Sequence, residues 1–268
     1  MIEKFSGTYC NIPFRVSKWD YNKFYDLKSI LLKYLPGIHI DQQPVDREKV
    51  AIEIDYILID KKEDEDGVWE DVNENNVKAC VKAHSHYEFI ILGILTTAFD
   101  FILQYKGVYF LHSAAGRIGS NGVIFWGKRA DGKSTIARKM REMGIDVIHD
   151  DRVCIIDGDF TGLNMIPFLR IDEVKCLITP KILSCDRLQK WNVNHHSLRY
   201  ELFCEFSDKV RAIGTIESRI VFQSIDNKEL SARRLDFVTR MAKNLSDKAF
   251  FVEGNANQII CTAEKVME

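Results

Sequence analysis

Neither sign of charge is in excess in this sequence, and that absence argues against a nucleic-acid-binding protein. The chain of 268 residues has 37 lysines and arginines against 39 aspartates and glutamates, a formal net charge of -2. Proteins that bind nucleic acid as a rule carry a basic surface that neutralises phosphates. A pI near 6.4 indicates no such surface, so we expect no nucleic-acid partner.

Closely spaced cysteine pairs are also missing. The seven cysteines are scattered, at Cys10, Cys80, Cys154, Cys176, Cys185, Cys204 and Cys261. Zinc ribbons and dithiol redox sites use cysteines separated by two residues, so this spacing argues against both. The histidines of "HSH" (84–86) and "HH" (195–196) lack the cysteine or carboxylate spacing of a zinc site. We therefore expect buried, reduced thiols in a cytoplasmic protein.

No apolar run is long enough to predict a membrane span. The longest, "FIILGILTTAFDFIL" at residues 89–103, is interrupted by Asp100 and is shorter than the roughly 20 residues that a spanning helix needs. It predicts a buried core helix. The opening residues "MIEKFSGTYC" lack the apolar core of a signal peptide. We expect a cytoplasmic protein without a membrane partner.

The first 100 residues contain a mixture of helix and strand signals and no internal repeat. Residues 17–37, "SKWDYNKFYDLKSILLKYLPG", have helical apolar spacing and end at Pro-Gly, which predicts a helix. Residues 50–60, "VAIEIDYILID", alternate and predict a half-buried strand. The charged residues 61–76 are interpreted as a solvated hairpin tip in preference to an acidic docking loop. This pattern predicts a smaller α+β region, with substrate recognition as its expected role.

Strands and helices alternate after residue 107. Two strands, a helix closed by Gly144 and two more short strands are expected, in order, at residues 107–118, 122–127, 132–144, 145–151 and 152–157. A later strand at 218–226 and an amphipathic helix at 229–245 are also predicted. Alternation of this kind indicates an α/β fold with a mixed sheet. We assign residues 101–268 to a nucleotide-binding domain and residues 1–100 to the N-terminal region.

The sequence "GKRADGKS" at residues 127–134 fits the phosphate-loop pattern G-x-x-x-x-G-K-[ST] at every defined position. Glycines let the main chain wrap its N–H groups around phosphate oxygens, and the helix that follows adds its positive end. Lys133 is expected to reach the β- and γ-phosphates of ATP, and Ser134 to ligate Mg²⁺. The predicted nucleotide-binding residues are Gly127, Lys128, Arg129, Ala130, Asp131, Gly132, Lys133, Ser134 and Thr135.

Two further patterns flank this loop. In "HDD", Asp150 follows Ser134 by 16 residues, which leaves room for one helix and a returning strand. Of two acids at a strand end, one can hold Mg²⁺ while its neighbour takes a proton from an attacking hydroxyl. His112, in "FLHSAAG", precedes the loop by 15 residues, and a lone histidine near an apolar strand is usually structural.

Together, residues 109–151 resemble the catalytic core of the HPr kinase/phosphorylase family and its looser serine-kinase relatives. The resemblance rests on a Leu-His strand, the phosphate loop and an Asp-Asp pair in this order. It implies a compact P-loop kinase core like that of phosphoenolpyruvate carboxykinase, and transfer of the γ-phosphoryl group of ATP to a seryl hydroxyl. By the same resemblance Asp150 is a catalytic base, Asp151 a carboxylate on the metal side, and His112 a catalytic-site histidine.

The sequence also departs from that family. Lys128, Arg129 and Asp131 stand where relatives usually carry small residues, and they are expected either to alter nucleotide preference or to be solvated loop charges. "MIPFLRIDEVK" replaces the glycine-rich signature of true HPr kinases, which argues against HPr as the acceptor and against reverse phosphorolysis. Arg170 within it is interpreted as a structural arginine.

Three functions stay open at this level. The first is a kinase for a seryl hydroxyl of a peptide or protein, including a ribosomal peptide precursor. The second is a small-molecule kinase, such as a free-serine kinase, and the third is a nucleotide-binding regulatory module without an acceptor. Family members often assemble, so a homo-oligomer is expected by analogy.

Overall fold

The structure is a computed structural model, and the chain in it forms two compact units. It describes residues 2–20, 23–41, 50–128, 130–160, 163, 166–208, 212–214, 219–222, 227–245 and 247–268. Unit 1 comprises Met1–Lys106, Phe160–Ile166 and Ser207–Ser231, and unit 2 comprises Gly107–Asp159, Pro167–Phe206 and Ala232–Glu268. Each unit contains a mixed sheet with helices, so the predicted α/β class is confirmed. The division of function at residue 100 stays a prediction.

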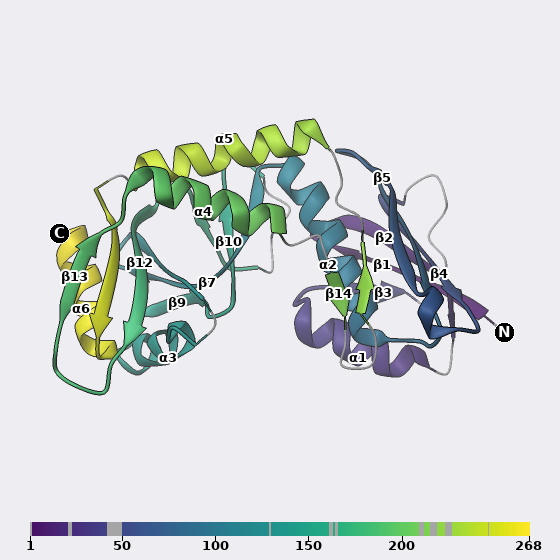
Figure 1. Ribbon diagram of the computed structural model, residues 1–268, viewed down its shortest axis with the longest axis horizontal. Helices are drawn as coiled ribbons and strands as arrows, with labels where there is room; N and C mark the ends of the chain where they lie inside the picture. The colour runs from purple at the N-terminus through teal and green to yellow at the C-terminus, as the bar shows by residue number, and fades with distance from the viewer. Residues whose placement is uncertain are drawn as a thin grey trace. The chain divides into compact units, whose positions relative to one another are not determined.

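Unit 1 is built on a six-stranded sheet in the order β3-β1-β2-β4-β6-β5 (Figure 1). Its strands are β1 (Ile2–Tyr9), β2 (Ile12–Asp20), β3 (His39–Asp41), β4 (Ile52–Leu58), β5 (Asp66–Val72) and β6 (Val77–Ala83). The pairs β2–β4 and β4–β6 are parallel, whereas the other pairs are antiparallel. Helices α1 (Phe24–Tyr34) and α2 (Glu88–Tyr105), the 3-10 turn η3 (Lys62–Asp64) and the short strands β14 (Ala212–Gly214) and β15 (Arg219–Val221) complete the unit.

The predicted elements of this unit are partly confirmed. The strand over residues 50–60 is present as β4, with alternating burial. The helix predicted from residue 17 begins only at Phe24, because Ser17–Asp20 continue β2, which pairs with β1. The hairpin-tip interpretation of residues 61–76 is wrong for most of the segment, since Asp66–Val72 form the edge strand β5. A turn joins β5 to β6, and there the Asn73 amide donates to the Asn76 carbonyl at 2.8 Å.

Helix α2 is the buried core helix that the apolar run predicts. Its length and a mean hydropathy of 1.4 are sufficient to cross a membrane, but 67% of it is buried inside the protein. It is apolar nearly all round, as a helix enclosed in a core can be. Asp100, near its centre, is itself only 9% exposed.

Unit 2 contains the second mixed sheet, in the order β11-β10-β7-β8-β12-β16-β13, with β9 also paired to β7. Its strands are β7 (Val108–Ile118), β8 (Asn121–Trp126), β9 (Asp146–His149), β10 (Arg152–Ile156), β11 (Phe168–Arg170), β12 (Val174–Ile182), β13 (Gln189–Asn192) and β16 (Ala249–Gly254). The central strands β8, β12 and β16 run parallel to one another. β7 pairs antiparallel with β8, β9 and β10.

Helices cover both faces of this sheet (Figure 1). One face packs on α3 (Lys133–Glu142) and α6 (Ala256–Met267) through a core that includes Phe125, Ile136 and Ile260. The other packs on α4 (His195–Asp208) and α5 (Lys228–Asn244) through a core that includes Leu177, Leu202 and Phe237. The result is a three-layer α/β/α arrangement in which adjacent residues of β8 alternate between the two cores.

The strand–strand–helix–strand–strand order predicted after residue 107 is confirmed by β7, β8, α3, β9 and β10. Gly144 follows α3 with a φ of +75°, the left-handed conformation expected of a helix-closing glycine. The predicted amphipathic helix is α5, and the predicted strand at 218–226 is present over Arg219–Val221. Residues 218 and 223–226 of that prediction lie outside the described residues. No pattern in the sequence predicted β12, β16, α4 or α6.

Candidate functional site

The phosphate-loop sequence connects the buried strand β8 to helix α3. β8 ends at Trp126, and α3 begins at Lys133 after Gly132, which acts as N-cap with a φ of +94°. Left-handed dihedrals of this kind cost a residue with a Cβ atom about 1–2 kcal/mol, so glycine suits the position. The strand–loop–helix context that the motif requires is therefore present.

Lys133 is held against the loop. Its Nζ donates to the carbonyl oxygens of Gly127, at 2.7 Å, and of Lys128, at 2.8 Å. The residue is only 6% exposed, and a buried ammonium is tolerated only when polar groups satisfy it. These two bonds join the start of the loop to the start of α3, so the loop closes on itself around the lysine side chain.

The end of β12 explains why glycine is needed at position 132, and it also lies next to Gly127. A Cβ at Gly132 would lie 2.1 Å from Cγ1 of Ile182, and one at Gly127 would lie 3.4 Å from Cγ2 of Thr179. Both distances leave the loop main chain packed directly against β12. Neither Thr179 nor Ile182 stands out in the sequence, and only the parallel pairing of β8 with β12 indicates that they lie under the loop.

Four residues of the predicted nucleotide site face outward. Lys128, Ala130, Ser134 and Thr135 are exposed, and Arg129 lies outside the described residues. Ala130 has a φ of +74°, a conformation that residues with side chains adopt rarely. The first amides of α3 have no intrahelical acceptor and lie at the positive end of the helix dipole. This end of the loop can therefore receive an anion.

The two aspartates lie in the short connection between β9 and β10. β9 ends at His149 and β10 begins at Arg152, and both strands follow the same edge of β7. The Ser113 amide donates to the Asp151 carbonyl at 3.1 Å, which ties the connection to β7. Nδ1 of His149 accepts from the amides of Asp151, at 3.1 Å, and Arg152, at 2.9 Å. An accepting Nδ1 carries no proton, so this ring acts as a cap for the turn.

The two carboxylates have different partners. Oδ2 of Asp150 lies 3.2 Å from Nη1 of Arg141, in the last turn of α3. Oδ1 of Asp151 lies 3.3 Å from Nε2 of His112. Arg141 is eight residues beyond Lys133, about 12 Å along the helix at 1.5 Å per residue. The Asp150 carboxylate is thus turned toward the far end of α3, and Asp151 is the acid that contacts His112.

The register of β7 relates His112 to the phosphate loop. Ser113, its neighbour, pairs with Trp126, the last residue of β8, and the loop begins one residue later. Paired residues of antiparallel strands lie about 4.5–5.5 Å apart at Cα. The His112 main chain is therefore near the start of the loop, and the His112–Asp151 pair belongs to the same region of unit 2.

No ready-made metal cluster is found among the described residues, where no three histidine, cysteine, aspartate or glutamate side chains gather. Mg²⁺ in nucleotide sites does not need one, because it takes one or two protein ligands together with phosphate oxygens and water. The exposed hydroxyl of Ser134 and the exposed carboxylate of Asp151 are ligands of the kind that Mg²⁺ prefers.

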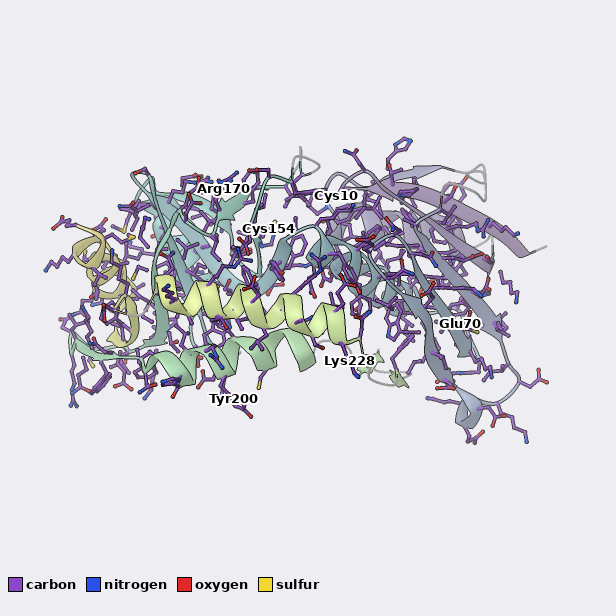
Figure 2. The ribbon with its side chains drawn as sticks, turned by 90° about the horizontal axis from the view of Figure 1, so that it is seen from above. Cys10, Glu70, Cys154, Arg170, Tyr200 and Lys228 are labelled. Atoms are coloured by element: carbon purple, nitrogen blue, oxygen red, sulfur yellow. The ribbon has the colours of Figure 1, made fainter. Side chains whose placement is uncertain are left out.

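Arg170, labelled in Figure 2, pairs with exposed acids, and its structural role stays an interpretation. Its guanidinium pairs with Asp159 at 3.3 Å and with Asp172 at 3.7 Å, and all three side chains are well exposed. The Arg170 amide also donates to Glu173 at 3.1 Å. Arg141, which the sequence did not single out, contacts the predicted site residue Asp150.

Comparisons with known proteins assign no family to the chain. No protein-family model matches it, and no curated protein matches its sequence.

Proposed function

We propose that the chain is an ATP- and Mg²⁺-dependent kinase of the HPr kinase-like kind. It transfers the γ-phosphoryl group of ATP to a seryl hydroxyl of a peptide or protein, with a ribosomal peptide precursor as one such acceptor. The observation that carries this proposal is the position of Lys133, whose ammonium binds the two carbonyls at the start of a loop that leads into a helix N-terminus. That arrangement presents main-chain amides and a positive charge to a polyphosphate.

The protein's part in phosphoryl transfer is to position groups and compensate charge. The loop residues from Gly132 to Thr135 would hold the phosphates, and Ser134 and Asp151 would hold Mg²⁺. Bound there, the metal ion would neutralise charge that develops on the phosphate oxygens. The oxygen of the acceptor forms a bond to the γ-phosphorus, the bond to the bridging oxygen of ADP breaks, and the hydroxyl proton passes to a carboxylate.

Asp150 is the proposed acceptor of that proton. Its pair with Arg141 is no obstacle, because the side chains are 41% and 52% exposed, and exposed ion pairs contribute at most about 1 kcal/mol. An incoming acceptor can therefore displace Arg141. His112 is proposed to orient Asp151 through their contact at 3.3 Å.

A nucleotide-binding regulatory module is the second candidate. The Asp150–Arg141 pair favours it, since a module that transfers nothing needs no carboxylate directed at an acceptor. A small-molecule kinase such as a free-serine kinase shares the proposed chemistry and differs only in the acceptor. Cytoplasmic location and a homo-oligomeric state remain expectations.

Transfer of radiolabelled γ-phosphate from ATP with Mg²⁺ to a panel of seryl peptides and free serine tests the proposal. We expect transfer by the native chain and a loss of about 100-fold or more in Asp150→Asn, the effect of removing a general base. ATP binding by that variant should be unchanged. Asp159→Asn, which neutralises an exposed acid paired with Arg170, is the matched control and should keep full activity.

One result would contradict the kinase activity, and another would contradict the role of Asp150. ATP binding without transfer to any hydroxyl acceptor would leave the regulatory module as the better account. Undiminished transfer in Asp150→Asn would show that another group takes the proton, and a loss confined to Asp151→Asn would assign that role to the acid next to His112.

A further inference from the structure

Asp131 makes contacts that the phosphate-loop pattern does not require. It stands just before Gly132, at a position that the pattern leaves open. Its Oδ2 accepts a hydrogen bond from the Lys128 amide at 2.5 Å. The same oxygen would lie 2.6 Å from a Cβ at Gly127, so the carboxylate reaches back across the loop to its first residues.

The main chain at the start of the loop is satisfied by two side chains of opposite charge. The carboxylate of Asp131 accepts a hydrogen bond from the Lys128 amide, and the ammonium of Lys133 donates to the carbonyls of Gly127 and Lys128. The Asp131 amide in turn donates to the Lys128 carbonyl at 3.3 Å. Both side chains belong to the end of the loop next to α3, and both bind main-chain groups at its start. They therefore connect the two ends of the loop.

We propose that Asp131 is a positioning residue that braces the phosphate loop in its binding conformation without itself contacting the nucleotide. The inference rests on the proposed nucleotide site and assigns to Asp131 a role different from direct binding. A loop ordered before the ligand arrives loses less conformational entropy on binding, so the brace raises affinity. The amides left for phosphate are then those at the start of α3, beyond the braced segment.

A carboxylate beside an anion site has an opposing effect, because like charges repel. If Asp131 acted chiefly as a competitor for phosphate, removing its charge would tighten binding. If it acts as a brace, removing its acceptor oxygen loosens the loop and weakens binding. The two roles therefore predict changes of opposite sign in the same measurement, and an asparagine, which keeps the acceptor oxygen but loses the charge, separates them.

The experiment measures the dissociation constant of ADP with Mg²⁺ by isothermal titration calorimetry on the full chain. Asp131→Ala is expected to bind ADP about tenfold more weakly, the effect of losing one hydrogen bond that orders the loop. Asp131→Asn is expected to bind within about twofold of the native chain, because its amide oxygen still accepts from Lys128. Asp247→Ala, an exposed aspartate in the turn before β16, is the control and should bind as the native chain does.

Each further outcome has a defined meaning. Unchanged or tighter binding by Asp131→Ala overturns the brace, even if the native chain binds ADP. Should Asp131→Ala fail to fold, a more than fivefold weakening in Asp131→Asn would also overturn it. Lys133→Met tests the proposed site separately. If the native chain does not bind ADP, or if Lys133→Met binds ADP as tightly as the native chain does, the proposed nucleotide site is wrong. The role proposed for Asp131 is then wrong as well.

Discussion

At the scale of single residues, the loop depends on how closely its main chain approaches β12. Gly132 meets Ile182 at a distance that no side chain can occupy, and its φ of +94° is left-handed. Gly144 has a similar φ of +75° but nothing within 4 Å of a Cβ. Both glycines therefore have a left-handed backbone conformation, but only Gly132 also lies against a neighbouring side chain.

This difference predicts unequal losses of stability. Gly144→Ala should lower the free energy of unfolding by about 1 kcal/mol, the cost of a left-handed alanine. Gly132→Ala should lower it by about 2–4 kcal/mol, because overpacking against Ile182 is added. Urea unfolding of both variants measures the two losses. Equal losses would show that the loop does not rest on β12 as described.

The partly buried carboxyl of Asp157 predicts a pH dependence of the stability of the fold. Burial raises the pKa of its carboxyl, although Arg240, which donates to it at 2.8 Å, acts in the opposite direction. A folded-state pKa above the unfolded value of about 3.9 means that the folded chain holds this proton more tightly. The contribution of Asp157 to stability is therefore greatest below about pH 4 and is lost as the pH rises through the raised value.

The prediction concerns the difference between the native chain and Asp157→Asn. The free energy of unfolding of the native chain, minus that of the variant, should fall as the pH rises from about 3 to 6. Urea titrations at a series of pH values supply both terms, and a difference that rises with pH would contradict the assignment. Asparagine keeps an acceptor for Arg240, so the comparison isolates the titration.

The sequence identifies most of the candidate site at this scale, but not its contacts. Glycines, a lysine and a serine at fixed spacing are a local pattern, and so is a pair of aspartates after a strand. The partners Ile182 and Arg141 are not local to the residues they contact. Asp150 and Asp151 were expected to work side by side, and no pattern in the sequence indicates that they have different partners.

At the scale of elements, α6 has a well-formed start. The side chain of Asn255 accepts from the Gln258 amide at 3.0 Å, and the Gln258 side chain accepts from the Asn255 amide at 2.9 Å. This reciprocal arrangement is a capping box. Its presence shows why a helix can begin at Ala256 directly after β16.

Removal of the cap should loosen that helix. Asn255→Ala is expected to lower the free energy of unfolding by about 1 kcal/mol, and Asn255→Ser, which keeps an acceptor oxygen, by less than half of that. Chemical denaturation followed by circular dichroism measures both. Equal effects of the two substitutions would argue that the cap bonds contribute little.

Elements with strong local patterns were predictable, and those that depend on pairing were not. β7, β8 and α3 carry apolar runs, turn glycines and a closing glycine within their own segments. Ser17–Asp20, at the end of β2, directly precede a segment with helical apolar spacing, so the predicted helix includes them. They form a strand because β1 pairs with them. Three of the four exposed positions of β5 are acidic, which conceals an edge strand in which Gly67 is buried and Trp69 half-buried.

At the scale of the whole molecule, the expectation that all thiols are buried is wrong in part. Cys154 (Figure 2) and Cys176 are buried, whereas Cys185 and Cys261 are exposed. Burial also raises the pKa of Cys176 to about 12, so its thiolate is scarce at neutral pH. The thiolate is the reactive form of cysteine.

Alkylation of the folded chain should therefore be selective. Iodoacetamide at pH 8 is expected to modify Cys185 and Cys261 within minutes and to leave Cys154 and Cys176 unmodified until denaturant is added. Peptide mass mapping with and without urea measures this. Early modification of Cys176 would contradict its position within the sheet of unit 2.

The sequence does not indicate which segments of the chain form each of the two units. Ser207–Ser231 belong to unit 1, although they lie between segments of unit 2. Their neighbours are distant in the chain, as in the hydrogen bonds of Asn227 to the Val72 carbonyl and the Tyr105 hydroxyl, both at 2.8 Å. Domain boundaries are predicted from changes in composition and from linker sequences. The sequence shows neither at the two ends of Ser207–Ser231, so it does not indicate that this segment belongs to unit 1.

Hydrogen–deuterium exchange of the native chain, with and without Mg²⁺ and ATP, tests the central claim most directly. If loop amides bind the phosphates, the nucleotide should slow exchange in peptides that cover residues 130–136 at the start of α3, and Lys133→Met should abolish the effect. Slowed exchange elsewhere with none in this segment, or no response to ATP at all, would contradict a phosphate site at the β8–α3 loop.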